Sequence, residues 1–192
     1  MQSCENRTLY QLLLPPGVDC LFYSHDYSLG TQVLVVRSSL HRYVAVAYAG
    51  TDDWKTALTD GDILTSDFGR STNVTQNDNI KNNYDSLHVP PGVRVHRGFN
   101  SAVFDSQYFP TLLNCISLAR VGRNCDGDGV ESARGVNGDA KISPPYELFT
   151  TGHSLGAADS VLLGAALHLA NPNETIRNIN FGCPKIGNIE WR

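Results

Sequence analysis

The feature that most limits how this chain can fold is the stretch from Tyr146 to Gly164, which reads YELFTTGHSLGAADSVLLG. Residues with strand propensity, Leu148 to Thr151, stop abruptly at a short run bounded by two glycines. After that run, apolar residues recur at helical spacing, at Ala157, Val161, Leu162, Ala165 and Leu169. The pattern predicts a strand, a sharp turn and a helix in immediate succession.

The turn itself, Gly152-His153-Ser154-Leu155-Gly156, has the G-x-S-x-G form of the nucleophile elbow of serine hydrolases. In an elbow the serine adopts strained backbone angles, and its hydroxyl is lifted clear of the sheet. Gly152 and Gly156 provide the space that such a turn needs. A packing turn without chemistry is the alternative, because the pentapeptide also arises by chance. The strand and helix around it favour Ser154 as a nucleophile.

Length and composition predict one globular domain over residues 1–192. Of the 192 residues, 41% are hydrophobic, which is enough for one buried core. A net charge of −4 without clustered Lys and Arg argues against a nucleic-acid-binding protein. The apolar runs are too short and too interrupted to form a transmembrane helix. The first residues do not form a secretory signal, so a cytoplasmic location is the default, and a secreted or lumenal one applies if the amino terminus is incomplete.

The five cysteines include no C-x-x-C pair, so the sequence predicts neither a zinc site nor a redox motif. In an oxidising compartment two disulfides are candidates, Cys4 with Cys20 and Cys115 with Cys125. Three triplets have the form of N-glycosylation acceptors, and they begin at Asn6, Asn73 and Asn173. Chance alone produces a similar number of triplets, so both modifications stay open at the level of sequence.

Taken in order, the chain alternates strands and helices. Two strands, 32–37 and 43–49, are joined by a polar turn, and the second is apolar at nearly every position, as in a strand buried on both faces. A short strand at 93–99 leads into a helix at 100–121, in which Pro110 predicts a kink or a second helix start. Another strand is expected at 175–181. This order predicts an α/β fold with a mainly parallel sheet.

Two segments read as surface loops, 65–92 and 122–145. The first is rich in Asn, Asp, Ser and Thr, and the second in Gly and Asp. The string from Asp126 to Gly129 has some features of a calcium loop, but the full ligand spacing is absent, so a solvated loop is expected there. The sequence implies no metal and no organic cofactor.

Four separated blocks carry a further pattern: 43–51 with Trp54 and Asp60 behind it, 95–99, 151–158, and 181–188. Together these blocks resemble the class 3, fungal-type triacylglycerol lipases, and the resemblance extends from about Thr31 to Asn188. Their order and spacing follow the family, which makes them far more specific than one pentapeptide. The resemblance implies an α/β-hydrolase-type, mainly parallel sheet flanked by helices. It also implies a serine esterase that acts on lipids or other esters, including at a lipid–water interface.

The resemblance also assigns roles to individual residues. Ser154 attacks the ester carbonyl and forms an acyl-enzyme. The backbone N–H of Leu155 and the loop residue Thr51 are the two donors of the oxyanion hole. His153 is structural in the family and points away from the serine hydroxyl. The other candidates for structural or solvated positions are Gly98, Phe99, Pro184 and Gly187, and the histidines His25, His41, His88, His96 and His168.

The sequence departs from the family at several points. Ala49 replaces a common Arg, and Asp159 stands at a usually apolar helix position, where a charge near the helix amino terminus is favourable. In the family the triad Asp and His follow the block that matches 181–188. The resemblance therefore implies missing carboxyl-terminal strands, an open sheet edge near 176–181, and no activity for these 192 residues alone. The alternative is a non-catalytic lipase-like remnant or lipid-binding module.

Overall fold

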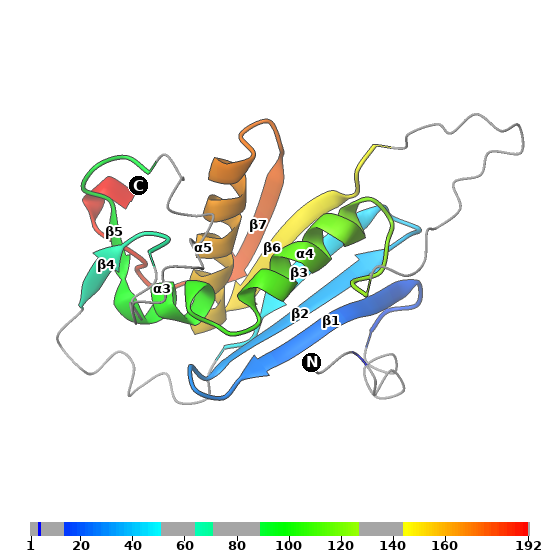
Figure 1. Ribbon diagram of the computed structural model, residues 1–192, viewed down its shortest axis with the longest axis horizontal. Helices are drawn as coiled ribbons and strands as arrows, with labels where there is room; N and C mark the ends of the chain where they lie inside the picture. Colours follow the sequence, from blue (N-terminus) through cyan, green and yellow to red (C-terminus); the bar gives the residue numbers. More distant parts are fainter. Residues whose placement is uncertain (1–3, 5–13, 51–63, 71–88, 127–143, 192) are drawn as a thin grey trace, which may run out of the picture.

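A five-stranded mixed sheet lies at the centre of the molecule, with the strand order β1-β2-β3-β6-β7 (Figure 1). The computed structural model describes residues 4, 14–50, 64–70, 89–126 and 144–191. The strands of the sheet are β1 (Val18–Asp26), β2 (Thr31–Ser38), β3 (Tyr43–Tyr48), β6 (Glu147–His153) and β7 (Ile176–Phe181). The helices are α3 (Arg97–Phe104), α4 (Phe109–Arg120) and α5 (Leu155–Ala170). A separate ribbon pairs β4 (Thr65–Asp67) with β5 (Arg94–His96), and a short 3-10 turn, η1, covers Ile189–Trp191.

The sheet changes its pairing direction at β3. Strands β1, β2 and β3 form an antiparallel meander, whereas β6 runs parallel to β3 and β7 runs parallel to β6. Parallel pairing therefore surrounds the predicted elbow, and the sheet as a whole is mixed. Strand β7 is an edge strand of this sheet, which agrees with the open edge near residues 176–181 that the resemblance implied.

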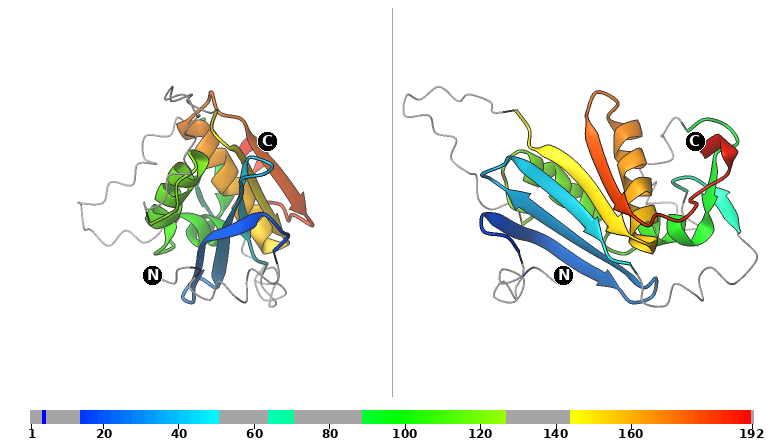
Figure 2. Two further views of the ribbon diagram at one scale, coloured as in Figure 1. Left: turned by 90° about the vertical axis from the view of Figure 1, so that its right-hand side faces the viewer. Right: turned by 180° about the vertical axis from the view of Figure 1, so that it is seen from behind.

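The helices α4 and α5 lie on the same face of the sheet, and the view from behind shows the strands in front of them (Figure 2). That face carries the fully buried apolar side chains of the sheet, which are Val33, Val35, Val44, Val46 and Leu148. The prediction that β3 is buried on both faces is wrong, because its buried residues alternate with half-buried ones. The alternation could not be seen in the sequence, because alanines occupy half-buried positions on the other face and the strand is therefore apolar at nearly every residue.

The helix expected over 100–121 is two helices. Helix α3 ends at Phe104, and α4 begins at Phe109 with Pro110 in its first turn. A proline fits there because the first helical N–H groups have no partner inside the helix. The second of the two outcomes predicted for Pro110, a new helix start, is therefore confirmed. Strand β5 is shorter than expected, since His96 already caps α3.

Two strands were not predicted. β1 contributes an edge of the sheet, and β4 occupies the start of the segment expected to be a surface loop at 65–92. That loop prediction is wrong at its beginning, because Phe68 is only 4% exposed and packs in the core. Residues 71–88 and 127–143, which make up most of the two predicted loops, lie outside the described residues.

Both candidate disulfides are present, Cys4–Cys20 and Cys115–Cys125. The first joins the residues before β1 to the strand itself, and the second joins α4 to the segment that follows it. Cys183 forms no disulfide and is exposed. Each disulfide thus joins two cysteines that are close together in the sequence, as the two candidate pairs did.

Candidate active site

Ser154 lies at the junction of β6 and α5 in a strained backbone conformation. Its φ is 55° and its ψ is −123°, and Leu155 begins the helix directly after it. Among the described residues, only Arg42 and Ser154 combine a side chain with a positive φ. A serine in that region costs free energy that the surrounding structure must offset. The predicted strand, sharp turn and helix are all present.

The two glycines of the pentapeptide are required by close packing. A Cβ on Gly152 would lie 2.1 Å from the carbonyl oxygen of Gly156. A Cβ on Gly156 would lie 2.4 Å from the carbonyl oxygen of Tyr48, at the end of β3. Neither position accepts a larger residue without movement of the backbone. The turn is tight because the helix doubles back onto the ends of two parallel strands.

The carboxyl end of β3 meets the elbow directly. A Cβ on Gly50 would lie 2.9 Å from the carbonyl oxygen of His153 and 3.6 Å from the Cβ of Ser154. This contact follows from the parallel register, which sets Tyr48 opposite Gly152. The chain therefore leaves β3 beside Ser154, as expected for a loop that supplies an oxyanion donor. Thr51, the residue proposed for that role, lies outside the described residues.

Leu155 is the first residue of α5, and its side chain is half-buried. The first N–H groups of a helix have no partner inside the helix and carry partial positive charge. The backbone N–H of Leu155 therefore lies next to Ser154, at the position where an oxyanion would develop in an attack by the serine.

His153 is exposed and its ring lies toward the end of β7. A Cβ on Gly182 would be 3.8 Å from the His153 Nε2. Within the described part of the chain, no hydrogen bond joins the hydroxyl of Ser154 to a histidine. His25 stacks on Tyr27, and His168 approaches the carbonyl oxygen of Glu174, while His88 lies outside the described residues.

His96 has a clear structural role. Its Nδ1 accepts a hydrogen bond from the N–H of Gly98 at 3.1 Å and so caps α3. Its ring also packs on Phe99, which is buried on the same helix. Burial lowers the pKa of His96 below its usual value. The neutral ring is the form that accepts this hydrogen bond.

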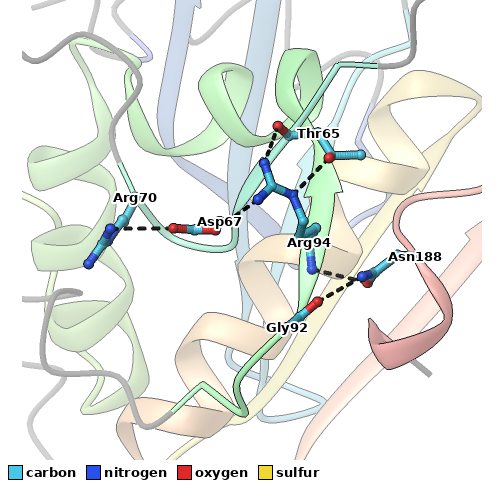
Figure 3. Close-up of polar contacts among 6 residues, drawn as sticks. All are labelled: Thr65, Asp67, Arg70, Gly92, Arg94 and Asn188. Atoms are coloured by element: carbon cyan, nitrogen blue, oxygen red, sulfur yellow. Dashed lines mark hydrogen bonds and ion pairs between the residues drawn. The ribbon is translucent and has the colours of Figure 1, made fainter.

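The block from Phe181 to Asn188 holds the end of the chain against the ribbon (Figure 3). Asn188 accepts a hydrogen bond from the N–H of Arg94 with its Oδ1 and donates one to the carbonyl oxygen of Gly92. Gly187 pairs with Val95, and a Cβ on Gly187 would lie 2.5 Å from the carbonyl oxygen of Arg94. Two blocks of the lipase-like pattern, far apart in sequence, thus pack on each other.

Asp159 lies in the second turn of α5, and its setting differs from the expectation. The side chain is only 5% exposed, and its Oδ1 has no hydrogen-bond partner among the described residues. Burial raises the pKa of this carboxyl well above its usual value. The prediction of a favourable charge near the helix amino terminus is therefore wrong, because desolvation favours the neutral acid.

A polar network that was not predicted joins α5 and β7. Ser160 donates a hydrogen bond to Asn180 at 2.6 Å, and Asn178 donates one to the hydroxyl of Thr150 at 2.7 Å. The sequence contained a pattern that indicates this network, since Asn178 and Asn180 lie two residues apart and so share one face of a strand. The network fixes the elbow helix against the edge strand.

The described residues contain no cluster of three or more His, Cys, Asp or Glu side chains suited to a metal ion. In the same part of the chain, no helix has both the length and the hydropathy needed to cross a bilayer.

Comparison with known proteins identifies the family. The family model for Lipase (class 3) matches residues 45–192. A lipase from Rhizopus niveus and one from Rhizopus oryzae are each 24% identical to this chain over 163 residues, which cover 82% of this chain and 31% of each relative. The chain therefore spans about a third of the length of these relatives.

Solved lipase structures share the fold. Lipase II from Rhizopus niveus has a TM-score of 0.60 and 21% identity, and the match covers 92% of this chain and 52% of that one. A triacylglycerol lipase from Penicillium expansum has a TM-score of 0.58 and 20% identity, with 91% and 53% covered. These matches confirm the α/β-hydrolase fold class expected from the sequence. With a family model that matches most of its length, the chain belongs to the class 3 lipase family.

Proposed function

We propose that this protein hydrolyses carboxylic esters of lipids through an acyl-enzyme on Ser154. The observation that carries the proposal is the positive φ of Ser154 at the junction of β6 and α5. With a ψ of −123°, Ser154 also lies outside the left-handed helical region that side-chain-bearing residues occasionally adopt, and residues held in such strained conformations cluster at active sites. Membership of the class 3 lipase family supports the same chemistry and the lipid ester as the substrate class.

The reaction begins when the Oγ of Ser154 attacks the ester carbonyl carbon. The carbonyl oxygen becomes an oxyanion, which the backbone N–H of Leu155 and the donor at Thr51 stabilise. Collapse of this intermediate releases the alcohol and leaves an acyl-enzyme, which water then hydrolyses. No metal or organic cofactor is needed in this scheme.

The serine proton requires a base. Since no described histidine is bonded to Ser154, we propose that the base and its acid partner come from a region beyond residue 188, as the family resemblance implies. An elbow serine without its base loses several powers of ten in rate. The 192-residue chain by itself is then expected to show no turnover.

Labelling with a fluorophosphonate probe tests the nucleophile. The probe is applied to this chain and to the product of any transcript that continues past the codon for Arg192. In a product that contains the base, we expect a label on Ser154 and hydrolysis of p-nitrophenyl esters. Ser154→Ala should lower the hydrolysis rate about a thousandfold or more, and Thr51→Ala about a hundredfold.

Ser24→Ala is the matched control, because Ser24 is a half-buried serine of β1 at the far side of the sheet. It should keep both label and activity. Ester hydrolysis that survives in Ser154→Ala contradicts the proposal.

A non-catalytic lipid-binding module is the second candidate function. The absence of a base next to Ser154 among the described residues favours it, as do the exposed Ile179 and Phe181 on β7. Co-sedimentation with phosphatidylcholine vesicles separates the two functions. Binding without any label on Ser154, in every natural product of the gene, supports the module.

A further inference from the structure

The turn between α5 and β7 carries the acceptor triplet Asn173-Glu174-Thr175. Helix α5 ends at Ala170, and the N–H of Glu174 donates a hydrogen bond to the carbonyl oxygen of Asn171 at 2.9 Å. This bond closes a four-residue β-turn in which Pro172 takes the second position, where its fixed φ fits. Asn173 is therefore at the tip of the turn, which stands above the sheet in Figure 1.

Both acceptor positions of the triplet are available. Asn173 and Thr175 are exposed, and neither side chain makes a hydrogen bond or ion pair with another described residue. Glu174 between them is turned aside, because its carboxylate pairs with Arg120 of α4. That ion pair holds the turn on the body of the molecule and leaves the amide of Asn173 facing solvent.

The two disulfides indicate the compartment in which such an acceptor is used. Cys115 is fully buried, so the Cys115–Cys125 bond is built into the core rather than added at the surface. Disulfides form and persist in oxidising environments, of which the endoplasmic reticulum lumen is one. The same lumen glycosylates Asn-x-Ser/Thr triplets on secreted proteins.

We propose that Asn173 carries an N-linked oligosaccharide. The donor is an oligosaccharide joined to a lipid through pyrophosphate. The Nδ2 of Asn173 forms a new bond to the anomeric carbon of the sugar, and the bond from that carbon to the phosphate oxygen breaks. The electron pair leaves with the lipid pyrophosphate, and the amide nitrogen loses one proton to a base of the transferase. The hydroxyl of Thr175 is the recognition element.

The position of the glycan is compatible with an open active site. Asn173 precedes the amino end of β7, whereas the N–H of Ser154 bonds to the carbonyl oxygen of Phe181 at the carboxyl end. A six-residue strand separates these ends by roughly 20 Å. A glycan on Asn173 therefore extends from the end of the sheet opposite to the elbow.

The experiment uses the full chain secreted from a eukaryotic cell behind a cleavable leader. Asn6 and Asn73 are changed to Gln in this background, so that any remaining glycan is on Asn173. We expect the secreted protein to lose the mass of one glycan after treatment with peptide-N-glycosidase F, and the peptide that contains residue 173 to show Asp in place of Asn. Asn173→Gln and Thr175→Ala should each abolish the shift.

Two matched controls define the acceptor. Thr175→Ser keeps the triplet and should keep the glycan, and Asn171→Gln changes an exposed asparagine of the same turn that lies outside any triplet. The mass of the same peptide is also measured on protein retained in the endoplasmic reticulum. Glycan occupancy at Asn173 can therefore be determined even if the protein is poorly secreted. Recovery of peptide 173 unmodified from both pools overturns the proposal.

Discussion

Asp159 is the residue whose chemistry fits its surroundings least. The carboxyl is buried in the elbow helix, and its Oδ1 has no partner in the part of the chain that the structure describes. Burial raises its pKa well above the usual value of 3.8. The folded protein therefore holds the proton more tightly than the unfolded chain. The stability that this proton provides is complete below the unfolded pKa and is lost as the pH rises through the folded pKa.

Asp159→Asn should accordingly make the protein more stable at neutral pH. The amide cannot ionise, so the gain should be near zero at about pH 4 and grow toward pH 8. At a pH above both pKa values, each unit by which the folded pKa exceeds the unfolded one contributes about 1.4 kcal/mol to the gain. Urea unfolding across this pH range measures it. The exposed Asp19, changed to Asn in the same way, is the control, and a gain that does not vary with pH would contradict the argument.

At the scale of residues, the sequence was informative where a local pattern dictates the conformation. Ser154, Gly152 and Gly156 could be found because an elbow needs small residues at fixed spacing. The burial of Asp159 could not be predicted from the sequence. It depends on which face of α5 packs on the sheet, and a single polar residue does not identify that face. The contact of Gly50 with Ser154 likewise depends on the register of two strands that are distant in sequence.

At the scale of elements, the Cys115–Cys125 disulfide links helix α4 to the segment that follows it. The two cysteines have a sequence separation of 10. A disulfide that closes a loop of this size lowers the conformational entropy of the unfolded chain and so stabilises the fold by about 3 kcal/mol. Cys115→Ala with Cys125→Ala should therefore lower the free energy of unfolding by about that amount. Cys183→Ala, which removes an exposed cysteine that forms no disulfide, should leave the free energy of unfolding unchanged in a urea titration.

Element prediction succeeded for long, regular segments and failed for short or irregular ones. The strand propensity of β2 and β6 and the helical spacing in α5 were visible in sequence. β1 was missed because its register shifts between Cys20 and Phe22, which breaks the alternation that marks a strand. β4 is only 3 residues long and exists because β5 pairs with it, which no local pattern records.

At the scale of the whole molecule, β7 is the exposed edge of the sheet. Its outward face carries Ile179 and Phe181, which are 51% and 61% exposed. An edge strand with exposed apolar side chains is a template for pairing with other chains. Ile179→Lys should therefore reduce self-association, measured by light scattering as a function of protein concentration, and should change the melting temperature little because the side chain is not in the core.

The control for this prediction is Leu40→Lys. Leu40 is 76% exposed but lies in the turn between β2 and β3, away from any edge strand. It should leave self-association unchanged. Equal effects of both variants would mean that general surface hydrophobicity, and not the edge, governs association.

The parallel pairing of β3 with β6 also sets the order in which the molecule assembles. β1, β2 and β3 follow one another directly and can pair as soon as they are made, whereas residues 49–146 separate β3 from β6. Pairing across so long a segment carries a larger loop-closure entropy and forms more slowly. The strained conformation of Ser154 depends on that late pairing, so a partly folded chain holds a relaxed serine, and the nucleophile elbow is completed only in the finished fold.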